Sequence, residues 1–136
     1  MSHPALELQG VLVAALRADD TLIAMLSPDG VRDGAARGAR FPYVEIGTWD
    51  DRDVGAQGWA GRDHRFEILV WSRAGGRSEA LRIMERVGVI AEGISADIGA
   101  FRLVNLVRLA DRVSRWRDGR SWRGVVVFRA LTEPHN

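Results

Sequence analysis

Arginine and tryptophan side chains gather where residues 108 to 123 are expected to form a hairpin. The group contains Arg108, Arg112, Arg115, Trp116, Arg117, Arg120, Trp122 and Arg123. Guanidinium and indole groups together could clamp phosphate and stack bases, which is the chemistry of nucleic-acid contact. Strand alternation would divide the arginines between both faces, however, and Asp111 and Asp118 dilute their charge. Arginine and tryptophan are also enriched at protein interfaces. We therefore predict a subunit interface that includes Arg115, Trp116, Arg117 and Arg120, with DNA contact as the alternative.

A second polar group lies between two expected strands. It consists of Trp49, Asp50, Asp51, Arg52, Asp53 and Trp59. Its aspartates could ligate a hard cation, but they lack the spacing and the distal bidentate glutamate of a calcium loop. Trp59 has only small neighbours to cover its indole, which favours an interface, whereas Trp49 could serve either an interface or the sheet core. We predict that this group is an assembly interface.

Residues that could support catalysis or a cofactor are few. His3, His64 and His135 are far apart in the sequence, and there is no cysteine. The segment Gly75-Gly76-Arg77-Ser78 could cradle a phosphate at a helix N-terminus, yet it lacks the glycine spacing and the lysine of a P-loop. A strand-to-helix turn capped by Ser78 is the favoured interpretation. We expect no metal, no cofactor and no enzymatic activity.

Composition limits the class of protein. The 136 residues are 46% hydrophobic, which fits one domain over residues 1–136 with a substantial core. The formal net charge of +1 provides no global attraction to nucleic acid or membrane, and every basic residue is arginine. The sequence shows no export signal and no apolar run of membrane-spanning length. We expect a soluble, unexported protein, and the absence of cysteine is compatible with assembly in a reducing cytoplasm.

Hydrophobic spacing predicts three helices. The first runs from Pro4 to Arg17, a short second one follows a cap at Asp19-Asp20, and the third runs from Ser78 to about Ser95. The Gly/Ala/Arg-rich segment 31–40 is expected to be a connection, with room for a short strand at Val31-Arg32.

Four strands are expected, at residues 43–49, 62–71, 101–113 and 122–131. The first two form a hairpin whose connection, Asp50 to Gly61, is much longer than usual and is therefore a candidate working part. The predicted fold is α+β, a mostly antiparallel four-stranded sheet packed by helices in the order α-α-β-β-α-β-β.

Three segments carry a family resemblance. They are Phe41-Pro42-Tyr43-Val44-Glu45-Ile46-Gly47, the strand-turn-helix stretch from Phe66 to Ala80, and the closing strand from Arg123 to Glu133. Together with Asp20-Thr21-Leu22 after the first helix, their order and spacing resemble the tail terminator (tail completion) proteins of long-tailed phages, prophages and gene transfer agents. The lysine-free, arginine-rich composition is similar to that of alphaproteobacterial members.

The resemblance implies a structural role. Such a protein forms a homo-hexameric ring at the head-proximal end of the tail tube, stops tube polymerisation and joins the tail to the neck of the particle. Its partners would be the tail tube protein and the neck stopper protein, with DNA passing through the lumen without sequence-specific binding and with no membrane contact. Two alternatives remain: another neck component, such as a stopper or adaptor, or a small nucleic-acid-binding module or enzyme.

Overall fold

The computed structural model describes residues 3–34 and 37–135. The helices are α1 (Pro4–Ala18), α2 (Asp20–Met25) and α3 (Ser78–Glu92). The strands are β1 (Val31–Arg32), β2 (Tyr43–Asp53), β3 (Arg62–Ser72), β4 (Asp97–Ile98), β5 (Phe101–Arg115) and β6 (Trp122–Pro134). No helix of the described residues is both long and apolar enough to cross a membrane.

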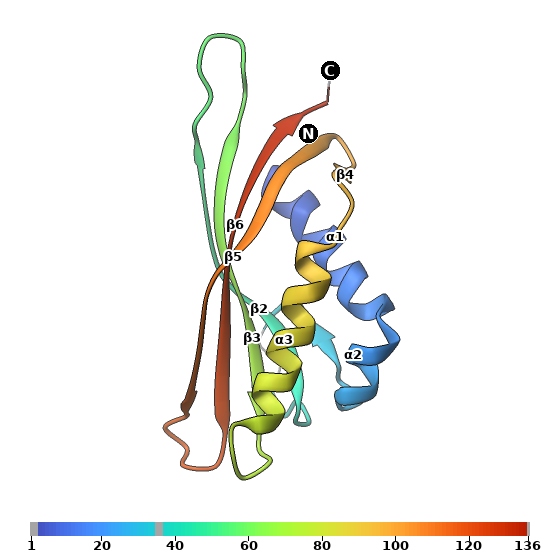
Figure 1. Ribbon diagram of the computed structural model, residues 1–136, viewed down its shortest axis with the longest axis vertical. Helices are drawn as coiled ribbons and strands as arrows, with labels where there is room; N and C mark the ends of the chain where they lie inside the picture. Colours follow the sequence, from blue (N-terminus) through green and yellow to red (C-terminus); the bar gives the residue numbers. More distant parts are fainter. Residues whose placement is uncertain (1–2, 35–36, 136) are drawn as a thin grey trace.

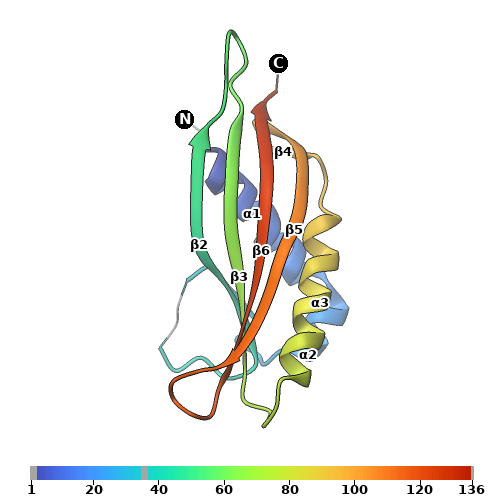
Figure 2. The same cartoon turned by 60° about the vertical axis from the view of Figure 1, so that its left-hand side comes forward.

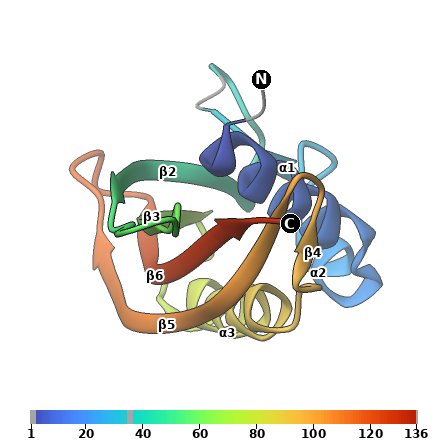
Figure 3. The same cartoon turned by 90° about the horizontal axis from the view of Figure 1, so that it is seen from above.

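The strands form one mixed sheet in the order β1-β2-β3-β6-β5-β4. Figure 3 shows from above how the long strands of this sheet curl. The prediction of a four-stranded, mostly antiparallel sheet in the order α-α-β-β-α-β-β is therefore wrong. The added strands, β1 and β4, have two residues each, and β1 runs parallel to β2. The fit of Val31-Arg32 to a strand was noted from the sequence, whereas β4 was missed, because two residues are too few to show alternation.

The long strands extend further than their hydrophobic patterns indicate. β2 continues beyond Trp49 through Asp50-Asp51-Arg52-Asp53, and β5 continues through Ser114-Arg115. Both extensions pair in register with a neighbouring strand. Polar side chains obscure the strand pattern there, but the backbone ladder continues because its hydrogen bonds do not depend on side-chain polarity.

Helices cover only one face of the sheet (Figure 2). Facing residues of paired strands share a face, and the fully buried set Phe66, Ile68, Val126 and Phe128 lies on the helix side. α3 packs there against β3, β5 and β6. The opposite face has no helix among the described residues and carries much of the charge of β2, β3 and β6.

The N-termini of the helices differ in how they are capped. Pro4 occupies the first turn of α1, and the Asp19 carboxylate accepts a hydrogen bond from the Leu22 amide at 2.8 Å, as its capping position predicts. The prediction that Ser78 caps α3 is wrong. Arg77 is the N-cap residue and makes no side-chain cap bond, while Glu79 instead accepts a bond from the Ser72 hydroxyl at 2.7 Å.

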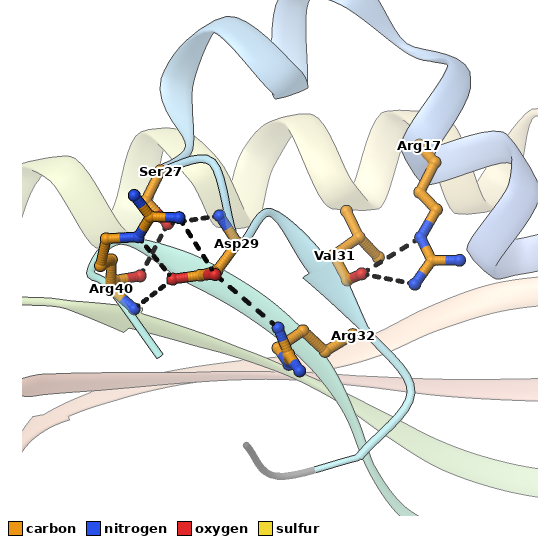
Figure 4. Close-up of polar contacts among 6 residues, drawn as sticks. All are labelled: Arg17, Ser27, Asp29, Val31, Arg32 and Arg40. Atoms are coloured by element: carbon orange, nitrogen blue, oxygen red, sulfur yellow. Dashed lines mark hydrogen bonds and ion pairs between the residues drawn. The ribbon is translucent and has the colours of Figure 1, made fainter. Parts of the chain in front are cut away.

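An ion-pair network fixes the segment that leads into β2 (Figure 4). Asp29 accepts hydrogen bonds from the backbone amide and the guanidinium of Arg40, and Arg32 lies 4.0 Å away. The Arg40 contact lowers the pKa of Asp29. Arg17 of α1 donates two bonds to the Val31 carbonyl. These contacts hold β1 beside the start of β2 and connect the sheet to the first helix.

Candidate assembly interface

The ten candidate interface residues occupy opposite ends of the sheet. Trp49, Asp50, Asp51, Arg52, Asp53 and Trp59 lie toward the β2–β3 hairpin, whereas Arg115, Trp116, Arg117 and Arg120 lie at the β5–β6 hairpin. Figure 1 shows the two hairpins pointing in opposite directions along the long axis. The structure therefore provides two separate surfaces, which we call the β2–β3 end and the β5–β6 end.

The connection between β2 and β3 is a hairpin and not the long loop predicted for Asp50 to Gly61. Val54 and Ala56 donate backbone bonds to the carbonyls of Gly61 and Trp59, so the ladder continues beyond the named strands. The turn itself contains only Gln57 and Gly58, both with positive φ, as a tight turn requires. The hairpin tip projects past the rest of the sheet (Figure 1).

Trp59 folds back onto its own hairpin. A side chain at Gly61 would collide with the indole ring, so the ring lies directly over that glycine. Its Nε1–H donates to the Glu133 carboxylate at 2.7 Å, and Arg102 bonds the other oxygen of that carboxylate. These contacts lower the pKa of Glu133, the Trp59 bond foremost. The indole is still 39% exposed, which leaves surface for a partner.

Trp49 joins the aromatic core, one of its two sequence-based alternatives. Its ring stacks on Phe66 with centroids 4.2 Å apart. The indole N–H donates to Nδ1 of His64 at 3.3 Å, and Nε2 of His64 lies 2.9 Å from the Thr132 hydroxyl. Burial lowers the pKa of His64, so the neutral ring accepts from Trp49 and donates to Thr132. An interface role for Trp49 remains a prediction.

Carboxylates and arginines neutralise one another at the β2–β3 end. Asp63 receives two bonds from Arg129, at 3.0 and 2.9 Å, and a third from Arg52 at 3.4 Å. The Arg129 contact is the main reason that the pKa of Asp63 is lowered. Asp51 lies 3.2 Å from Arg62. A shallow hollow lies over these pairs, lined by Asp50, Asp51, Arg52, Asp63, Arg65 and Arg129. Within the described residues, no cluster of three metal-ligating side chains forms.

The β5–β6 end combines stacked arginines with indole rings. Trp116 has Arg117 and Arg123 over its ring, at 4.6 and 5.3 Å, and forms a perpendicular pair with Trp71, with centroids 5.1 Å apart. Trp122 has Arg115 and Arg77 over its ring, at 4.9 and 5.7 Å.

Asp118 organises the turn at this end. It accepts bonds from the amides of Arg120 and Ser121 and from the Ser121 hydroxyl. Those bonds, led by the Ser121 hydroxyl, lower its pKa strongly. The turn is therefore held by a carboxylate whose oxygens are already occupied.

Two further arginines reach this end from segments that the sequence analysis did not connect with it. Arg73 and Arg77 come from the β3–α3 loop, where Arg73 stacks over Phe41 at 3.9 Å and bonds Ser121. Conversely, Arg108 is removed from the group, because it pairs with Asp111 at 2.6 Å and lies against Gly88 of α3. In the sequence, Arg73 could be noticed only because it follows the end of strand 62–71. That position does not reveal the sheet order, so it does not show that the β5–β6 hairpin lies beside Arg73.

Comparison with known proteins identifies the family. The tail completion protein gp17 family matches residues 10–133. The chain belongs to the tail completion protein family. The predicted resemblance to tail terminator proteins is confirmed, and with it a tail terminator role at the head–tail junction.

Solved structures resemble the whole fold of this tail completion protein. A chain from "Virion of native gene transfer agent (GTA) particle" is 30% identical over 97% of this chain and 99% of that chain, with a TM-score of 0.84. The fold is also similar to "Structure of bacteriophage SPP1 gp17 protein", at 24% identity, a TM-score of 0.58 and coverage of 97% and 91%. No curated protein matches the sequence.

Proposed function

We propose that the protein assembles as a homo-hexameric ring on the head-proximal end of a phage-like tail tube, where it stops polymerisation and joins the tail to the neck stopper. The similarity to a chain of a gene transfer agent virion over nearly the full length of both chains is the observation that carries this proposal. DNA would pass through the lumen without sequence-specific contacts. Assembly would take place in the bacterial cytoplasm.

Two open strand edges support ring closure. In the described part of the chain, β1 pairs with Val44 and Glu45 alone, and β4 with Phe101 and Arg102 alone. Among the described residues, β2 beyond Glu45 and β5 beyond Arg102 therefore have no strand on their outer sides. Such edges offer unpaired backbone groups to another chain. Because they lie on opposite sides of the sheet, they favour a head-to-tail contact that can close into a ring.

Strand direction permits that contact. β2 and β6 run one way, and β3 and β5 run the other way. When two copies are related by rotation about an axis along the strands, β5 of one copy meets β2 of the next in antiparallel orientation. The exposed side chains of Val104, Val107 and Leu109 lie on β5 and add apolar area to such a contact.

Deleting the gene tests the function directly. Capsids should fill with DNA but lack joined tails, and the free tails should be overlong, because an uncapped tube end remains a template for further subunits. Tail lengths measured by electron microscopy distinguish the alternatives. Free tails of normal length would assign the protein to a stopper or adaptor role. Normal particles would exclude the tail machinery and leave a nucleic-acid-binding module or an enzyme.

A further inference from the structure

Six arginines surround the β5–β6 end, and most of them have no carboxylate partner in the part of the chain that the structure describes. This arginine cluster consists of Arg73, Arg77, Arg115, Arg117, Arg120 and Arg123. Arg73 lies 3.6 Å from Asp118. Within residues 3–34 and 37–135, none of the other five takes part in an ion pair. Those five arginines therefore concentrate positive charge without a paired carboxylate, on a molecule whose net charge is only +1.

The indoles prepare these arginines for a planar, oxygen-rich partner. Trp116 and Trp122 each have two guanidinium groups over the ring. A guanidinium held over an indole can present its remaining N–H groups to the two oxygens of a carboxylate. Arg115 already donates one N–H to the Gly119 carbonyl at 3.1 Å. Because stacking restricts the side chain beforehand, less entropy is lost when a partner binds.

We propose that the arginine cluster docks onto a carboxylate-rich protein surface of the adjacent ring in the assembled particle. This inference rests on the proposed function, because strands that pair around a ring run roughly along its axis. The hairpin at the end of such strands points toward a neighbouring ring and away from the lumen. The partner surface is expected to present aspartate and glutamate side chains near an apolar patch, since arginine and tryptophan together are typical of interface hot spots.

The same geometry disfavours DNA as the partner. The rings of Trp116 and Trp122, which a base would need for stacking, already lie beneath guanidinium groups. Phosphate contacts would also be expected to follow a groove, whereas these arginines are confined to one end of the sheet. A carboxylate surface meets the exposed N–H edges without displacing the stacked groups.

Charge reversal at the cluster provides the test. The probes are tails and heads purified from particles that lack this protein, and binding of the full chain to each is measured between 50 and 500 mM salt. At low salt, Arg117→Glu should weaken binding to one of the two probes about tenfold or more, and the difference should shrink as salt rises. Arg117→Lys retains the positive charge but lacks the planar guanidinium that can bond both carboxylate oxygens, so it should bind with intermediate strength.

Arg82→Glu is the matched control. Arg82 is an exposed arginine on α3 and lies outside both the arginine cluster and the β2–β3 end, so the same reversal there should leave binding within about twofold of the original chain. Thermal melts of both variants verify folding. Equal binding by Arg117→Glu and Arg82→Glu would overturn this inference while leaving the proposed function intact. Failure of the unaltered protein to bind either probe would instead overturn the proposed function.

A second experiment, with a 30-base-pair DNA duplex, distinguishes a protein partner of the arginine cluster from a nucleic-acid partner. Binding of the duplex to the unaltered protein at 150 mM salt is measured by fluorescence anisotropy. No binding, or equal binding by Arg117→Glu, supports a protein partner. DNA affinity that Arg117→Glu abolishes would assign the cluster to nucleic acid and overturn the proposal.

Discussion

At the β2–β3 end, Asp51, Asp63 and Glu133 each lie within ion-pair distance of an arginine. At the β5–β6 end, by contrast, Asp118 is occupied by its own turn and five arginines have no ion-pair partner within the described residues. Arginine is abundant at both ends, so composition does not produce the difference. It arises from whether the facing strand supplies a carboxylate, and it separates arginines that stabilise the fold from arginines available to a partner.

The comparison can be tested first with tryptophan. Trp49→Ala should destabilise the protein by about 3 kcal/mol, because it removes the stack on Phe66 and leaves Nδ1 of buried His64 without its donor. Trp116→Ala at the other end should cost about 1 kcal/mol, since that half-buried indole contacts Arg117, Arg123 and half-buried Trp71 and, among the described residues, no fully buried ring. Urea unfolding measures both. Equal losses would show that the β5–β6 end is also part of the stabilising core.

The second test removes a carboxylate. Asp63→Asn should cost about 1 to 2 kcal/mol, because Arg129 and Arg52 lose their shared charged acceptor, partly offset by solvent around the arginines. Arg120→Ala should change stability by less than about 0.5 kcal/mol, since no ion pair is lost. Urea unfolding of the two variants measures both changes in the free energy of unfolding. A larger cost for Arg120→Ala would contradict the assignment of its end to partner binding.

A smaller effect should follow at the hairpin tip. Trp59→Ala should cost about 0.5 to 1 kcal/mol through loss of its bond to Glu133 and its contact with Gly61. Gly61→Ala should displace the indole without deleting it, and its emission should shift to longer wavelength as water reaches the ring. If Gly61→Ala leaves the spectrum and the tail-joining activity unchanged, Trp59 does not rest on this glycine.

The smallest effect is the pH dependence that belongs to Asp63. Its pKa is lowered in the folded protein, so its contribution to stability is complete above the unfolded value of about 3.9 and is lost as pH falls below it. Thermal melts between pH 7 and pH 3 should therefore show a steeper acid loss for the original chain than for Asp63→Asn. Parallel curves would indicate that other carboxylates account for the acid sensitivity.

The sequence predicted the elements better than their connections. Alternation located the four long strands because Phe66, Ile68 and Val126 each face a buried core. It placed the end of the first strand at Trp49, since the charged residues that follow do not alternate in polarity. The tight turn at Gln57-Gly58 was hidden within a glycine-rich stretch, where several residues could have adopted positive φ.

The candidate residues were identified by type, but their environment was not. The sequence left Trp49 open between the sheet core and an interface and favoured an interface for Trp59; the structure stacks Trp49 in the core and lays Trp59 over a glycine of its own hairpin. Arg108 and Arg117 belong to the same arginine-rich segment of the sequence. In the structure, Arg108 pairs with Asp111 and lies against Gly88 of α3. Such distinctions depend on neighbours that are remote in the sequence.

By itself, the sequence determined the family, the absence of cysteine and lysine, and the positions of the long strands, because these follow from residue identity and local hydrophobic spacing. Only the tertiary structure decided the six-stranded order, the separation of the two hairpin ends and the pairing of each arginine. Local spacing sets which face of a strand is buried, whereas sheet order sets which strand lies opposite. The opposite strand decides whether a guanidinium meets a carboxylate, an indole or solvent.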